Sequence, residues 1–194
     1  MKYIKLYNTD LEVSQIALGH MRISKLSVDE AEVLIKEALA LGINFYDHAD
    51  IYGGGKCEEI FGEVLKRNPG MREKMVIQSK CDIVVEAKGG KRYDTSHDYI
   101  MECVTNSIKN LNCGYLDILL IHRADALCDP KELAETFKEL KEKGMVKYFG
   151  VSNHTKTRIE LIQKYWKEPL VVNQMQLSIV HAPMIDFGFC VDMV

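Results

Sequence analysis

Short apolar runs alternate with longer segments of helical periodicity along most of the chain. In the segment that follows Ser27, apolar residues recur three and four positions apart, which is the spacing of one buried helix face. The run Leu116–Ile121 is almost continuously apolar, which is typical of a strand that is buried on both sides of a parallel sheet. The alternation therefore predicts consecutive β/α units.

The pattern predicts an N-terminal hairpin, six core strands and the helices that connect them. The hairpin and strands are expected at Tyr3–Tyr7 with Glu12–Gln15, and at Ile16–Leu18, Ile43–Tyr46, Met75–Ser79, Leu116–Ile121, Val146–Val151 and Leu170–Asn173. The helices are expected at Ser27–Gly42, Glu58–Arg67, Asp98–Leu111, Pro130–Gly144 and Thr155–Trp166. The last segment, Met175–Val194, lacks clear periodicity, so no element is predicted there.

Two architectures are built from such units, a doubly wound sheet and a β/α barrel. A doubly wound sheet usually carries a G-x-G-x-x-G turn after its first strand. The glycines of this chain, Gly53–Gly55, follow the second strand and lack that order. Polar residues end nearly every predicted strand, and β/α barrels assemble their active sites from those ends. We therefore predict a parallel (β/α)8 barrel of the TIM type with about six of its eight units present, forming a single incomplete domain over residues 1–194.

Composition and charge narrow the possible partners. Hydrophobic residues make up 47% and charged residues 27% of the 194 residues, as in ordinary globular proteins. The formal net charge of −3 argues against a nucleic acid or an anionic membrane as the partner. No apolar run approaches the roughly 18 residues of a membrane span, and the N-terminus lacks the apolar core of a signal peptide. We expect a cytoplasmic protein and leave its oligomeric state open.

The cysteines give no sign of a disulfide framework or a zinc site. They contain no C-x-x-C pair and are scattered along the chain, at Cys57, Cys81, Cys103, Cys113, Cys128 and Cys190. Such spacing favours reduced and mostly buried thiols.

Four residues at or just after predicted strands are candidates for catalysis. Asp47, Lys80 and His122 each end a strand, and Tyr52 follows Asp47 by five positions. Each residue alone has an ordinary structural explanation, such as a turn, a packed aromatic ring, a solvated charge or a core histidine. Because the carboxyl ends of parallel strands meet at one face of a barrel, we expect the four to lie together.

This set suits proton transfer to an oxygen. A tyrosine has a reference pKa near 10, so we expect a neighbouring cation to stabilise its phenolate. Lys80 supplies that charge, Asp47 holds the ammonium in place, and His122 donates or relays a hydrogen bond at the oxygen. Side chains cannot provide a hydride, so the chemistry implies a nicotinamide cofactor.

Two other kinds of barrel site use similar residues. A metal site is possible at Asp47, His48 and Asp50 with His122 and His154. However, Lys80 repels a cation and no second histidine pairs with His48 two positions away, so we predict no metal. Lys80 as a Schiff-base lysine is disfavoured because a close aspartate keeps an amine charged. His48 is interpreted as a residue that lines the pocket or supports the catalytic groups from behind.

Three motifs together resemble the aldo-keto reductase family, in particular its bacterial branch that reads DHADIYG. They are GINFYDHADIYGGGKCEEIFG at residues 42–62, DILLIHRAD at 117–125 and KYFGVSN at 147–153. The resemblance runs from about residue 3 to about residue 187. It implies an eight-stranded β/α barrel that reduces aldehydes and ketones with NADPH. The family's catalytic tetrad falls on Asp47, Tyr52, Lys80 and His122, with Tyr52 as the general acid.

The resemblance also implies a cofactor site. The family's contacts to the nicotinamide carboxamide fall on Ser152, Asn153 and Gln174, and we assign Met21, after the first strand, to the same site. The implied cofactor is NADP(H), with NAD left open, and the implied partner is a small carbonyl compound.

Six predicted strands fall short of the eight strands and about 250 residues of a closed barrel. In barrels generally the phosphate site follows strands seven and eight, so the segment that binds the cofactor phosphates is expected to be absent. Two hypotheses follow. The chain is an NAD(P)H-dependent carbonyl reductase read from an incomplete coding sequence, or it is a truncated barrel fragment that is inactive or acts only by binding.

Overall fold

The computed structural model describes residues 1–85 and 91–186. Its centre is a curled sheet of six parallel strands in the order β10-β9-β8-β5-β4-β3. The strands are β3 (Ala17–Gly19), β4 (Phe45–Asp47), β5 (Val76–Cys81), β8 (Leu116–Ile121), β9 (Val146–Ser152) and β10 (Leu170–Gln174). This arrangement confirms the six predicted β/α units.

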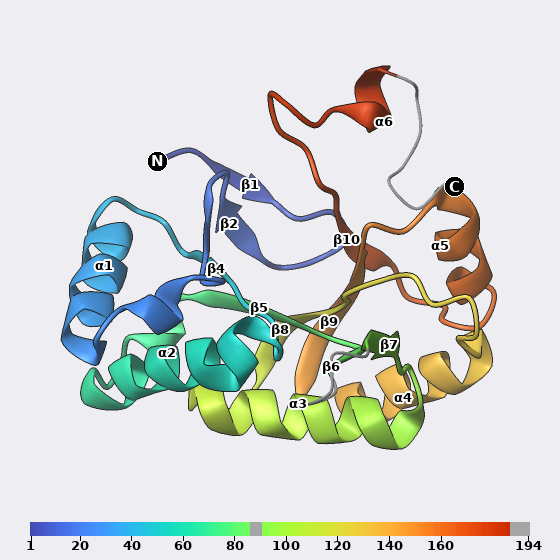
Figure 1. Ribbon diagram of the computed structural model, residues 1–194, viewed down its shortest axis with the longest axis horizontal. Helices are drawn as coiled ribbons and strands as arrows, with labels where there is room; N and C mark the ends of the chain where they lie inside the picture. The colour runs from blue at the N-terminus through green and yellow to red at the C-terminus, as the bar shows by residue number, and fades with distance from the viewer. Residues whose placement is uncertain (86–90, 187–194) are drawn as a thin grey trace.

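Five helices cover the convex side of the sheet, and the N-terminal hairpin lies against the other side (Figure 1). The helices are α1 (Val28–Ala40), α2 (Lys56–Arg67), α3 (His97–Leu111), α4 (Pro130–Glu142) and α5 (Lys156–Gln163). No helix among residues 1–85 and 91–186 is both long and apolar enough to cross a membrane.

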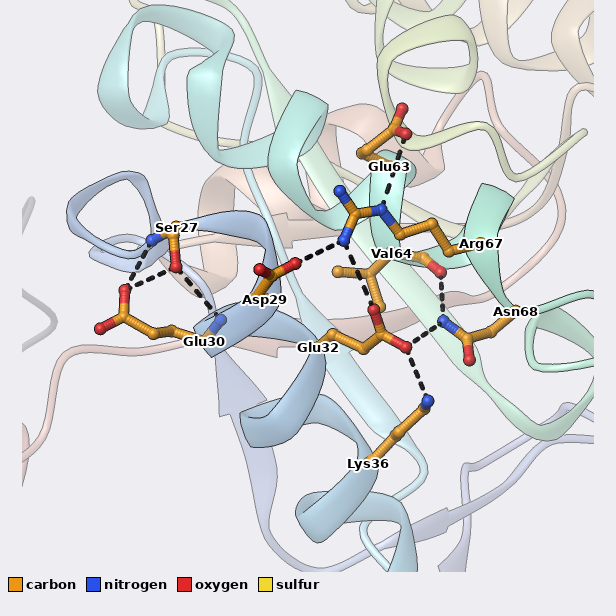
Figure 2. A network of polar contacts seen from close by, with 9 residues as sticks. All are labelled: Ser27, Asp29, Glu30, Glu32, Lys36, Glu63, Val64, Arg67 and Asn68. Atoms are coloured by element: carbon orange, nitrogen blue, oxygen red, sulfur yellow. Dashed lines mark hydrogen bonds and ion pairs between the residues drawn. The ribbon is translucent and has the colours of Figure 1, made fainter.

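The start of α1 is set by a capping box. The Ser27 hydroxyl accepts a hydrogen bond from the Glu30 N–H, and the Glu30 carboxylate accepts one from the Ser27 N–H. On the surface between α1 and α2, Arg67 bonds Asp29 at 2.7 Å and lies within 4 Å of Glu32 and Glu63 (Figure 2). These contacts tie the first two helices together outside the core.

The apolar run of β8 faces two separate cores. Leu119 and Ile121 point outward, into the large core between the sheet and the helices. Ile118 and Leu120 point inward, where they pack against Leu11 beside the N-terminal hairpin. Burial on both faces explains why this strand is apolar at every position except Asp117, which pairs with Arg72, rather than alternating.

The predicted N-terminal hairpin is present and closes the interior of the sheet. Its strands are β1 (Tyr3–Lys5) and β2 (Glu12–Ser14), and Val13 of β2 joins the inner core. At its turn the Asp10 carboxylate accepts a 2.6 Å hydrogen bond from the hydroxyl of Tyr148 in β9. The open end of the half-barrel, where the strands end, lies opposite this plug.

Two described elements were not predicted. A second hairpin pairs β6 (Ile83–Val85) with β7 (Lys91–Tyr93), and a short helix α6 spans Pro183–Asp186. Both lie in loops that follow strands, where the pattern is too short to show a period. Cys190 and the rest of the predicted aperiodic segment beyond Asp186 lie outside the described residues, whereas the other five cysteines are free thiols.

Candidate active site

The four candidate catalytic residues lie together at the carboxyl ends of β4, β5 and β8. Asp47 is the last residue of β4, Lys80 is the penultimate residue of β5, and His122 follows β8. Backbone hydrogen bonds continue the sheet beyond the assigned strands, from the His122 N–H to the Cys81 carbonyl at 3.0 Å. The predicted juxtaposition is therefore a direct result of parallel pairing.

Tyr52 reaches this group through a tight turn. Residues Tyr52–Gly55 form a 3-10 turn in which Gly53, Gly54 and Gly55 all have positive φ, between 61° and 88°. Residues other than glycine rarely adopt this backbone conformation. A Cβ on Gly53 would also come within 2.9 Å of Ser24. The three glycines therefore allow the sharp turn that carries the Tyr52 ring to Lys80.

Lys80 is the centre of the site and is only 2% exposed. Its ammonium donates hydrogen bonds to the Asp47 carboxylate at 2.7 Å, the His48 carbonyl at 2.7 Å and the Tyr52 hydroxyl at 3.3 Å. Burial lowers the pKa of Lys80, while the negative charge of Asp47 opposes that shift. All three ammonium hydrogens are thus directed at acceptors.

The protonation of Tyr52 differs from the expectation. We expected Lys80 to lower the phenol pKa, but burial and then the charge of Asp47 raise the pKa of Tyr52 to about 12. The physical reason is that Asp47 neutralises the ammonium at close range, so little net positive charge reaches the phenol. Because Lys80 donates to the Tyr52 oxygen, the phenol hydrogen remains available for another acceptor.

His122 stands across from Tyr52 as a neutral imidazole. The two rings meet edge to face with their centroids 5.9 Å apart. Burial, followed by the charges of Lys80 and Arg123, lowers the pKa of His122 to about 4. A neutral imidazole carries one N–H donor, so His122 can hydrogen-bond an oxygen held near Tyr52.

The three residues assigned to the nicotinamide also lie together, at the ends of β9 and β10. Ser152 donates to the Gln174 carbonyl at 3.0 Å, and the Asn153 amide donates to the Ser152 hydroxyl at 3.2 Å. The Gln174 amide donates to the second oxygen of Asp47 at 3.2 Å, which joins this cluster to the catalytic group. Hydroxyl and amide groups are the donors and acceptors that a carboxamide requires, so the cluster fits a nicotinamide.

Met21 is placed less centrally. It lies in the exposed turn after β3, and its backbone carbonyl accepts a 3.6 Å contact from the Cys57 thiol. Among the described residues, the hydrogen bonds that link Ser152, Asn153 and Gln174 do not include Met21.

Of the two interpretations of His48, the structure excludes lining the pocket, whereas the His48 carbonyl does support the catalytic group by accepting a hydrogen bond from Lys80. Side chains alternate along a strand, so Asp47 points into the barrel and His48 points outward toward α2. There it stacks on His20, with ring centroids 4.4 Å apart and planes inclined by 4°, and meets Phe61 edge to face. Both histidines are almost completely buried.

Sequence reasoning missed Gln78, which lies two positions before Lys80 on the same face of β5. Its amide nitrogen donates to the Asp47 carboxylate at 2.6 Å and to the Gln174 side-chain oxygen at 3.3 Å. The signal was present, because a glutamine that directly follows the apolar run MVI is unusual in the middle of a buried strand.

Several buried acids surround the site without being part of it. Burial raises the pKa of Glu58 to about 7 and that of Asp82 to about 8. Asp82 directly follows β5 with φ of 111°, and its carboxylate accepts a hydrogen bond from the Arg123 N–H at 2.9 Å. Across the described part of the chain, no three or more His, Cys, Asp or Glu residues are grouped so as to hold a metal ion.

Comparison with known proteins identifies the architecture. The sequence model of the aldo/keto reductase family matches residues 15–190. The uncharacterized oxidoreductase YcsN of Bacillus subtilis is 42% identical over 87% of this chain and 59% of its own length, and the oxidoreductase YdhF of Escherichia coli is 41% identical over 90% and 60%. The chain thus spans about three-fifths of the length of these curated relatives.

Among solved structures, a thermostable aldo-keto reductase, Tm1743, described in complex with the inhibitor epalrestat, superimposes with a TM-score of 0.81 at 27% identity. The match covers 95% of this chain and 65% of that structure. The six described strands therefore correspond to part of a (β/α)8 barrel, as the sequence predicted.

Proposed function

Because the chain belongs to the aldo/keto reductase family, we propose that it provides the catalytic centre of an NADPH-dependent reductase that converts aldehydes or ketones to alcohols. The observation that carries this proposal is the chain of contacts from Asp47 through Lys80 to Tyr52. The proposed substrate is a small carbonyl compound.

In the proposed reaction, Tyr52 is the general acid. When bound, the nicotinamide cofactor supplies a hydride to the carbonyl carbon. Tyr52 donates its proton to the carbonyl oxygen, which becomes the alcohol, and is left as a phenolate. The Lys80 ammonium, 3.3 Å from the phenol oxygen, stabilises that phenolate. With its pKa raised to about 12, Tyr52 is protonated at neutral pH and a weak acid, so proton donation depends on Lys80 stabilising the phenolate that is left.

His122 is proposed to polarise and orient the carbonyl group. Its lowered pKa keeps the ring neutral, and a neutral N–H donor adds no positive charge that would compete with Lys80. Ser152, Asn153, Gln174 and Met21 are proposed to seat the nicotinamide. Their position at or after the ends of β3, β9 and β10 supports this role, because β/α barrels assemble their binding sites from those ends.

The test follows NADPH oxidation with a series of simple aldehydes, using NADH as a parallel arm. We expect Tyr52→Phe to lower kcat by about 100- to 10,000-fold, which is the usual contribution of a general acid. Tyr7→Phe is the matched control, since Tyr7 is exposed at the surface, and it should leave kcat unchanged.

Two results would contradict the proposal. Equal turnover by wild type and Tyr52→Phe would remove Tyr52 from the chemistry. Failure of the wild-type chain to bind either cofactor would favour the alternative, a barrel fragment that is inactive or acts only by binding.

A further inference from the structure

Gln78 is a polar side chain at a buried position in the sheet, where an apolar residue is usual. It lies in the middle of β5, paired with Asp47 of β4 on one side and with Ile118 of β8 on the other. The inward-facing residue before it, Val76, belongs to the apolar inner core, and Gln78 itself is only 2% exposed. Burying an amide is costly unless its hydrogen bonds are made.

The orientation of the Gln78 amide follows from its partner. The Asp47 carboxylate only accepts hydrogen bonds, so the group that faces it at 2.6 Å is the amide nitrogen. The second hydrogen of that nitrogen is directed at the Gln174 side-chain oxygen, 3.3 Å away. Both donors of one amide therefore serve two different parts of the site.

Gln174 is fixed from both ends as a result. Its oxygen accepts from Gln78, and its nitrogen donates to the second oxygen of Asp47 at 3.2 Å. Asp47, Gln78 and Gln174 thus form a closed ring of hydrogen bonds. Asp47 also holds Lys80 at 2.7 Å, so the ring joins the proposed nicotinamide seat to the acid–base group.

We propose that Gln78 is a positioning residue that sets the orientation of the Gln174 amide for the cofactor and locks it to Asp47. The inference rests on the proposed function, since it assigns Gln78 a role at the same site. Gln78 touches neither the substrate nor the reacting atoms. It acts through Gln174.

The buried oxygen of the Gln78 amide supports a role beyond packing. Among the described residues this atom has no hydrogen-bond partner. A side chain selected only to fill space would avoid an unsatisfied buried acceptor. The amide is retained because its nitrogen makes the two contacts to Asp47 and Gln174.

The test is a double-mutant cycle on NADPH affinity, measured by the change in NADPH fluorescence on binding. We compare wild type, Gln78→Met, Gln174→Met and the double variant, with Ile118→Val as a control that alters the same inner core without touching a polar group. Methionine keeps the length of the side chain, so the fold is expected to survive, and urea denaturation checks this.

We expect Gln78→Met to weaken NADPH binding about tenfold. Gln174→Met should weaken it by at least the same factor. The double variant should be no more than twofold weaker than Gln174→Met, because Gln78 acts only through that residue. In turnover assays at saturating NADPH, Gln78→Met should keep kcat within about threefold of wild type, since the contacts of Lys80 with Tyr52 remain. Ile118→Val should bind NADPH like wild type.

Other outcomes separate the alternatives. Unchanged affinity in Gln78→Met would reduce Gln78 to a packing residue and overturn the inference, whatever the change in stability. Fully additive losses in the double variant would show that Gln78 acts independently of Gln174 and would also overturn it. If the wild-type chain bound no nicotinamide cofactor, the proposed function and this inference would fail together.

Discussion

Asp47 and His48 are neighbours in the sequence and both are buried, but their side chains lie on opposite faces of β4 and differ in their hydrogen bonds. Inside the barrel, the Asp47 carboxylate accepts hydrogen bonds from Lys80, Gln78 and Gln174. Outside, the His48 ring packs on the His20 ring, and the ring nitrogens of both lack hydrogen-bond partners among the described residues. The inner face thus provides hydrogen-bond partners for a charged side chain, whereas the described residues around the two histidines provide none for the ring nitrogens.

The difference shows two physical solutions to the same problem. The charges of Asp47 and Lys80 are kept because each is the partner of the other. The histidines remain buried because they are neutral: burial lowers the pKa of His20 to about 4 and that of His48 well below its usual value. The inner pair keeps its charges near neutral pH, whereas we expect the interface around the two histidines to lose stability in acid.

The largest effect is expected from removing one charge of the inner pair. Asp47→Ala leaves the Lys80 ammonium buried without its counter-charge, so we expect a loss of about 3–5 kcal/mol in the free energy of unfolding. Urea denaturation measures this loss. The double variant Asp47→Ala with Lys80→Met should recover much of the stability but no reductase activity. If the double variant were as unstable as Asp47→Ala, unpaired charge would not be the cause.

A smaller effect is expected on the outer side, and it depends on pH. The folded-state pKa of His20, about 4, lies below the usual 6.5. The stability that comes from its neutral form is therefore present above pH 6.5 and is lost as pH falls toward 4. We expect this histidine to account for a loss on the order of 3 kcal/mol between those values.

The measurement compares urea denaturation of wild type and His20→Leu at pH 6.5 and pH 4.5. The leucine variant should lose less stability on acidification. His97→Gln is the contrasting control, because Asp98 and then Glu139 raise the pKa of this surface histidine. Its stabilising contribution is present at low pH and is lost as pH rises through that pKa. The same pH dependence in wild type and His20→Leu would contradict the comparison.

The smallest effect on stability is expected from a pair of opposite charges that lies at the surface. Asp29 pairs with Arg67 at 2.7 Å on the surface between α1 and α2 (Figure 2), but the Asp29 side chain is 87% exposed. Exposed pairs of this kind often contribute nothing measurable. Asp29→Asn should therefore leave the urea midpoint unchanged at both low and high salt. A clear destabilisation would show that pairing, rather than burial, decides the value of the inner pair.

Much of the fold and part of the site could be predicted from the sequence. The six strands were found because each is a short apolar run between helical periods, and parallel pairing then brings Asp47, Lys80 and His122 together. The hairpin of β6 and β7 was missed because β7, Lys91–Tyr93, is polar and does not stand out as an apolar run. The two alternatives for His48 could have been separated from the sequence, since alternation along β4 places its side chain on the face opposite Asp47.

Other features depend on distances that no sequence pattern contains. The raised pKa of Tyr52 results from the balance between burial, Asp47 and the charges nearby. The link from Gln78 to Gln174 joins residues 96 positions apart. The contact between these two side-chain amides becomes visible only once the strands are placed in three dimensions.

The hairpin that plugs the half-barrel has a consequence for the order of assembly. Its turn, at Asp10, bonds Tyr148, 138 residues further along the chain, and Leu11 and Val13 share a core with Val76, Ile118 and Leu120. Much of the surface on which the hairpin packs therefore lies far from it in the sequence. Because contacts of such long range cost loop-closure entropy before they stabilise the fold, we expect the hairpin to be buried late in folding.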